Sequence, residues 1–150
     1  MWWMSIVTRR LREGRTYEEF RQAWFHSVGF GTTARLYTAI NVFDPREIIV
    51  VAIGEAREGQ DPMALLRTDV KERLEHPLED VIEPEIGRTF GILVAEDDFS
   101  AQGAIAYRGA SIEGRPTDLA EIDRALVIAQ ELIRRAGEER DRAKENRSSR

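Results

Sequence analysis

EIIVVAIGE, residues 47–55, is the stretch of sequence that decides the fold. Alternate side chains of a β-strand point to opposite faces of a sheet. Its six aliphatic residues therefore divide into two sets, with Ile48, Val50 and Ala52 on one face and Ile49, Val51 and Ile53 on the other. Full burial of a large aliphatic side chain contributes about 1.5–3 kcal/mol relative to exposure. A sheet that contains this strand therefore needs cover on both of its faces.

The elements around this strand follow from periodicity and from capping signals. The spacing of apolar residues predicts strands at residues 5–11, 35–43 and 89–95, helices at 17–28 and 62–76, and a last helix from 117. Thr16 and Glu19 form a capping box at the start of the first helix, and Asp61-Pro62 has the form of an N-cap followed by an N1 proline. Asp44-Pro45-Arg46 predicts a turn between the second and third strands, and residues 78–86 predict a short helical piece.

The order of these elements, β-α-β-β-α-β followed by a helix, predicts an α+β fold. We expect a ferredoxin-like domain over residues 1–100, a loop over 101–116 and a C-terminal helix with a frayed tail over 117–150. Two helices can cover only one face of the four-stranded antiparallel sheet. The second face is then covered either by the C-terminal helix or by the sheet of a second copy. We favour the second copy, which gives a dimeric α+β barrel, with the last helix packed on its own body or on the partner.

Composition excludes several classes of function. The chain of 150 residues suits one domain, and its net charge of −5 argues against nucleic acid as a partner. The absence of cysteine excludes disulfides, thiolate zinc sites and cysteine nucleophiles. Because the chain has neither a bilayer-length apolar run nor a signal peptide, we expect no membrane partner and a cytoplasmic location.

Three polar side chains suggest a ligand site on the sheet. Tyr37 and Asn41 share a face of the strand at 35–43, and we expect Arg9 to reach the same side, next to Phe43. An apolar cavity with a few placed polar groups is typical of small-molecule sites. Arg9 could bind a carboxylate or an enolate, while Asn41 and Tyr37 could orient a carbonyl group. The alternative is a satisfied polar cluster at a dimer interface.

His26 is the second candidate, near the end of the first helix and close to its aromatic residues. Its ordinary pKa near neutrality suits a general base or a haem ligand, and the alternative is a capping or surface histidine. Trp24 lies on the aromatic face of the same helix, where core packing and substrate contact are both open. Two histidines without cysteine do not suggest a metal site.

Residues 12–26, REGRTYEEFRQAWFH, contain a glycine, a small capping residue, acidic residues, an aromatic residue, a tryptophan and a nearby histidine. This stretch resembles the first loop and helix of the dimeric α+β barrel superfamily, in its EthD-like and antibiotic-biosynthesis monooxygenase-like families. The resemblance implies a homodimer that binds a small apolar or aromatic ligand, such as a cofactor-independent monooxygenase or related enzyme acting on an aromatic or polyketide-like substrate.

The residues and the resemblance together give one expected site. We expect His26, Arg9 and Asn41 to act in catalysis, and Tyr37, Trp24 and Phe43 to contact the substrate. No cofactor is expected, with a haem-binding protein as one alternative. The other alternative is a non-catalytic binding or assembly module whose sheet face is filled with side chains.

Overall fold

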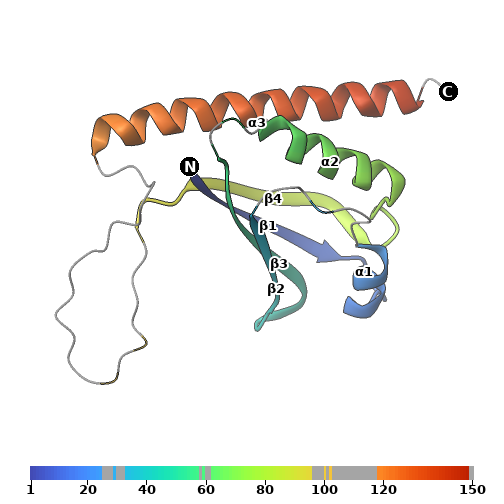
Figure 1. Cartoon of the computed structure of the whole chain (residues 1–150). Helices are drawn as coiled ribbons and strands as arrows, with labels where there is room; N and C mark the ends of the chain where they lie inside the picture. Colours follow the sequence, from blue (N-terminus) through green and yellow to red (C-terminus); the bar gives the residue numbers. More distant parts are fainter. Residues whose placement is uncertain are drawn as a thin grey trace.

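The computed structural model describes residues 1–24, 29, 33–57, 59, 62–95, 100, 102 and 118–148. In chain order its elements are β1 (Trp2–Leu11), α1 (Tyr17–Ala23), β2 (Ala34–Asn41), β3 (Asp44–Glu55), α2 (Pro62–Glu75), β4 (Ile82–Ile92) and α3 (Leu119–Ser148) (Figure 1). The four strands form one open antiparallel sheet in the order β2-β3-β1-β4. The predicted α+β class with a C-terminal helix is confirmed.

The register of the strands divides the sheet into two faces. The residues directly opposite one another in an antiparallel pair share a face, and Val51 lies opposite both Ile6 of β1 and Tyr37 of β2. We call this side the open face; its members on the three strands are Met4, Ile6 and Thr8, Arg35, Tyr37 and Ala39, and Ile49, Val51 and Ile53. The opposite side, which carries Ile48, Val50 and Ala52, is the helix face. The predicted division of the aliphatic residues of β3 is confirmed.

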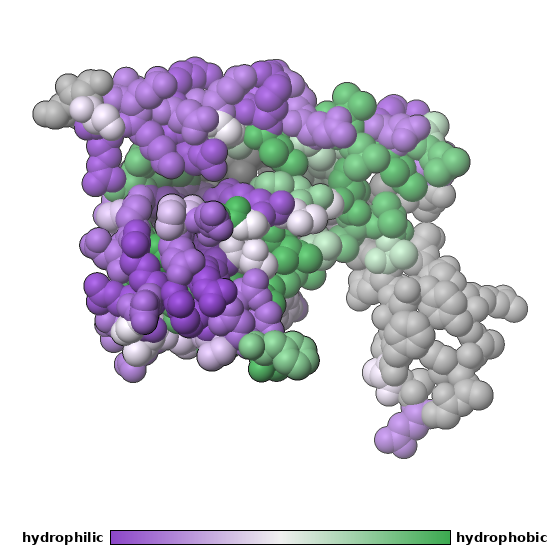
Figure 2. Space-filling model, turned by 180° about the vertical axis from the view of Figure 1, so that it is seen from behind, coloured by the Kyte–Doolittle hydropathy of each residue, from purple (hydrophilic) through white to green (hydrophobic). Residues whose placement is uncertain are grey.

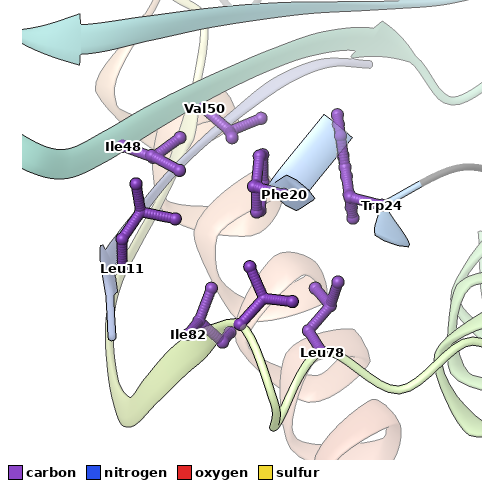
Figure 3. Close-up of a cluster of buried hydrophobic side chains, with 8 residues drawn as sticks. Leu11, Phe20, Trp24, Ile48, Val50, Leu78 and Ile82 are labelled. Atoms are coloured by element: carbon purple, nitrogen blue, oxygen red, sulfur yellow. The ribbon is translucent and has the colours of Figure 1, made fainter. Parts of the chain in front are cut away.

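The hydrophobic core lies on the helix face, between β3 and α1. Phe20 and Ile48 are fully buried, and the Phe20 ring stacks on Trp24 with their centroids 5.7 Å apart. Figure 3 shows Phe20 and Trp24 side by side, with Val50 on one side of them and Leu78 on the other. The core consists of Leu11, Phe20, Trp24, Ile48, Val50, Leu78, Val81 and Ile82. The aromatic side of the first helix therefore packs into the body of the protein, as its spacing predicts.

The capping box forms at the start of α1. The Glu19 backbone N–H donates to the Thr16 hydroxyl at 3.2 Å, and the Thr16 N–H donates to the Glu19 carboxylate at 2.7 Å. This backbone hydrogen bond, together with the guanidinium of Arg15, lowers the pKa of Glu19. The helix ends at Ala23, earlier than expected, because Trp24 is extended and closes the last turn with a bond from its N–H to the Phe20 carbonyl. Residues 25–28 of the predicted helix lie outside the described residues.

The turn between β2 and β3 differs from the prediction. It is formed by Val42 and Phe43, and Asp44 already belongs to β3. The Asn41 side chain accepts a hydrogen bond from the Phe43 N–H at 2.9 Å and donates one to Glu47. Asparagine commonly closes a turn in this way. This local bond moves the reversal two residues before the Asp-Pro signal.

The last strand is longer than its apolar pattern predicts. β4 begins at Ile82 and residues 79–81 form a turn, so the helical piece expected over 78–86 is wrong. The β4 strand pairs only with β1, and an edge strand tolerates Pro84, which lacks an N–H donor. The register shift between Arg9 and Leu11 of β1 absorbs the extra residues of this segment.

The C-terminal helix α3 lies along α2, on the helix side of the sheet (Figure 1). Arg67 of α2 contacts Glu139 at 3.5 Å, and Arg147 donates to the Leu74 carbonyl at 2.7 Å. None of the described side chains of α3 is buried. The helix continues beyond Gly137 to Ser148, and ion pairs of Glu138 with Arg134 and with Arg142, each one turn away, support this part of it. No described helix combines the length and the apolar character needed to cross a membrane.

Glu131 provides a test of these ion pairs. Hydrogen bonds from Arg134 and Arg135 lower its pKa to about 2. The pKa of Glu131 in the folded chain lies below its ordinary value of 4.5, so its ion pairs stabilise the fold fully above pH 4.5. This stabilisation is lost as the pH falls through about 2. A carboxyl-carbon NMR titration should therefore show Glu131 titrating near pH 2, and Arg135→Gln should move its pKa upward. An unchanged pKa in Arg135→Gln, with Arg124→Gln as the control on the same helix, contradicts this geometry.

Candidate functional site

The structure does not bring the expected polar trio together. Tyr37 lies on the open face, and the Asn41 amide reaches Glu47 at the end of the same face. Arg9 lies opposite Ile48, so its side chain is on the helix face, where the residue is only 8% exposed. The expectation that Arg9 shares a side with Tyr37 and Asn41 is therefore wrong, because the pairing register gives it the opposite orientation.

The other three expected residues lie apart as well. Trp24 packs in the core and is 8% exposed, with the Arg21 guanidinium 5.4 Å from its ring centroid. Phe43 is at the tip of the hairpin and is 94% exposed. His26 lies outside the described residues. Only Tyr37 and Asn41 of the expected six thus share a surface in the described chain, and the assigned roles stay predictions.

The open face is an apolar surface without cover among the described residues. Side chains at its centre, Met4, Ile6, Ile49, Val51 and Ile53, are partly exposed, and Tyr37 beside them is 55% exposed. The α1 helix contributes Phe20 to the core on the other face, and α3 lies on α2 rather than across these residues. A sheet packed on one face only usually carries polar residues on the other. Exposed apolar patches of this kind are typical of contact surfaces.

A second apolar region lies on α3. Its N-terminal half carries the exposed side chains Leu119, Val127 and Ile128, which are 80%, 65% and 54% exposed. Figure 2 shows hydrophobic surface gathered at this end of the helix, whereas the C-terminal half is hydrophilic. The two halves of α3 therefore present different chemistry to their surroundings.

A polar depression of about 570 Å³ lies at the end of the sheet and is lined by residues of both faces. Its lining residues are Thr8, Arg9, Arg10, Glu47, Glu83, Glu85, Ile86 and Gly87. Gly87 allows the close approach of the Thr8 hydroxyl, since a Cβ atom there would lie 2.2 Å from that oxygen. Arg10 pairs with Asp44 at 2.6 Å and lies 3.8 Å from Glu83. The depression thus offers charged and hydrogen-bonding groups beside an apolar surface, a combination typical of ligand sites.

Arg9 is the centre of a group of charges on the helix face. Its burial, and then the neighbouring guanidinium of Arg88, lower the pKa of Arg9 to about 10, while Asp69 of α2 acts in the opposite direction. Arg73 of α2 adds a further positive charge. Arg88 lies opposite Val7, two residues from Arg9 on β1, so both arginines project from the same face.

These partners of Arg9 were missed in the sequence. Asp69 and Arg73 are four residues apart on α2 and therefore lie on one side of that helix. The alternation of residues along β4 puts Arg88 on the side that faces the helices. Only the register with β1 shows that it lies beside Arg9. The spacing of Asp69 and Arg73 could therefore have been used to predict that they lie together. The position of Arg88 beside Arg9 could not be predicted without knowing how β1 and β4 pair.

No group of three or more histidine, aspartate or glutamate side chains that could hold a metal ion occurs in the part of the chain that the structure describes. Comparison of the chain with models of protein families, with curated proteins and with solved structures finds no match.

Proposed function

We propose that this protein is a small-molecule-binding homodimer in which two ferredoxin-like sheets pair through their open faces as a dimeric α+β barrel. The order β4-β1-β3-β2, antiparallel throughout, agrees with a ferredoxin-like connection of the strands. The core on the helix face contains Phe20 of α1 and Leu78, which follows α2. These features support a helix face that is covered at its centre, while its outer strands stay exposed at Leu36 and Ile40 of β2 and at Ile86 and Phe90 of β4.

The open face is the observation that carries this proposal. Its central aliphatic side chains stay partly exposed although they belong to the two middle strands, β1 and β3. The open face could be covered by α3 or by a second copy of the chain. The helix α3 packs with α2 and β4 and does not cover it. A second copy offers the same apolar surface, and a two-fold axis lets one surface cover itself. Two sheets packed in this way lie about 10 Å apart, with their side chains interdigitated.

The second part of the proposal is that the dimer is an enzyme. The resemblance of residues 12–26 favours a cofactor-independent monooxygenase or a related enzyme acting on an aromatic or polyketide-like compound. The apolar open face and the charged depression beside it suit a ligand with an aromatic body and polar substituents. A non-catalytic binding or assembly module is favoured by one observation. Of the expected site residues that the structure describes, only Tyr37 and Asn41 share a surface.

Light scattering coupled to size exclusion tests the pairing. At micromolar concentration we expect twice the 17.2 kDa mass of one chain. A mass of one chain over a wide concentration range contradicts the dimer. Oxygen uptake with hydroxylated aromatic compounds then separates an oxygenase from a binding module, because a module binds such compounds without consuming oxygen.

A further inference from the structure

We propose that the helix face around Arg9 and Arg88 binds the carboxylate of an apolar organic acid. This inference rests on the proposed small-molecule function and names the chemical class of ligand. The site lies between β1, β4 and α2, on the opposite side of the sheet from the proposed dimer contact.

The first support is the state of Arg9 itself. It lies on a central strand, is 8% exposed, and its Nε atom has no hydrogen-bond partner among the described residues. An arginine keeps its charge at neutral pH even when burial lowers its pKa to about 10. Burying a cation without full hydrogen bonding is costly, and an oxyanion bound to the guanidinium offsets that cost. Arg9 therefore has unused capacity to donate.

The second support is the balance of charge around Arg9. Positive charges come from β1, β4, α2 and α3, and the residues are Arg9, Arg88, Arg73 and Arg140. Asp69 of α2 attracts both Arg9 and Arg88, and Glu72 of the same helix acts on Arg73. Among the charges that act on Arg9, the guanidiniums of Arg88 and Arg73 repel it, and Asp69 alone is opposite in sign. A carboxylate bound beside Arg9 and Arg88 reduces this repulsion.

The third support is the apolar surface beside the charges. Ile86 and Phe90 flank Arg88 on the same face of β4 and are 38% and 42% exposed. Arg88 is itself exposed, so it connects the buried Arg9 with the surface. A guanidinium binds a carboxylate through two parallel hydrogen bonds, and an aromatic ring can pack against Phe90. These neighbours favour an acid with an aromatic or aliphatic body over a small inorganic anion.

Titration with 2-naphthoate, followed by NMR chemical shifts, tests the site. We expect saturable binding of 2-naphthoate, and binding of the uncharged 2-naphthamide at least tenfold weaker. Arg88→Gln should weaken 2-naphthoate binding about 10- to 100-fold and leave 2-naphthamide unchanged. We choose Arg88 for substitution because it is exposed, whereas replacing the buried Arg9 would also destabilise the fold. Arg124→Gln on α3 is the control and should bind as the natural chain does.

Several outcomes overturn this inference. They are the absence of saturable 2-naphthoate binding, equal affinity for the acid and the amide, and an Arg88→Gln variant that binds 2-naphthoate normally. Inorganic phosphate that displaces 2-naphthoate at equal concentration overturns the ligand class, since the site then selects charge alone. A dimer that does not bind 2-naphthoate contradicts this inference and leaves the pairing intact. A monomer that binds 2-naphthoate contradicts only the pairing.

Discussion

Phe20→Ala is expected to lower the free energy of unfolding by about 3–5 kcal/mol, the cost of removing a fully buried phenylalanine. The ring is completely buried, stacks on Trp24 at 5.7 Å and lies 6.1 Å from the Tyr17 ring. Its loss leaves a cavity between α1 and the helix face of the sheet. Small domains have a total stability of about 5–15 kcal/mol, so this single change removes a large share of it. Urea denaturation followed by tryptophan fluorescence measures the difference.

The matched control for this experiment is Phe43→Ala. It removes the same ring from a side chain that is 94% exposed at the hairpin tip. We expect a change within about 0.5 kcal/mol, as for most surface substitutions. Equal effects of the two substitutions would show that α1 does not pack on β3 as described.

The parts of the fold that were predictable from sequence depend on local signals. The capping box at Thr16 works through residues three positions apart, and the alternation in β3 needs only the geometry of a strand. The position of the hairpin turn was missed because the Asn41 side chain closes the backbone before the Asp44-Pro45 pair. The start of β4 was missed because its residues form a strand by pairing with β1, not by an apolar pattern of their own.

The candidate site was less predictable than the fold, for a related reason. Whether Arg9 faces the helices or the open side depends on its register with Ile48, and a shift of one residue reverses the side. Register is a property of two distant segments, so residues 5–11 alone do not contain it. The identification of Arg9 as a ligand-binding group stays a prediction, now with Arg88 rather than Tyr37 as its neighbour.

Val51→Lys is expected to raise the dissociation constant of the proposed dimer by about 30-fold or more, because a charge left buried and unpaired at an interface costs about 2–5 kcal/mol. Val51 lies at the centre of the open face, opposite Ile6 and Tyr37. A two-fold axis through this surface brings two lysines into the same apolar contact. In a single chain the lysine can extend its ammonium group into water, so the fold survives.

The measurement is sedimentation velocity over a range of concentrations, with circular dichroism to show that the variant is folded. Val42→Lys is the matched control, because it makes the same change at a turn residue that is 87% exposed and outside the open face. We expect Val51→Lys to sediment as a monomer where the natural chain and Val42→Lys sediment as dimers. A dimer that tolerates Val51→Lys must use another surface, and the exposed apolar half of α3 is then the surface to substitute next.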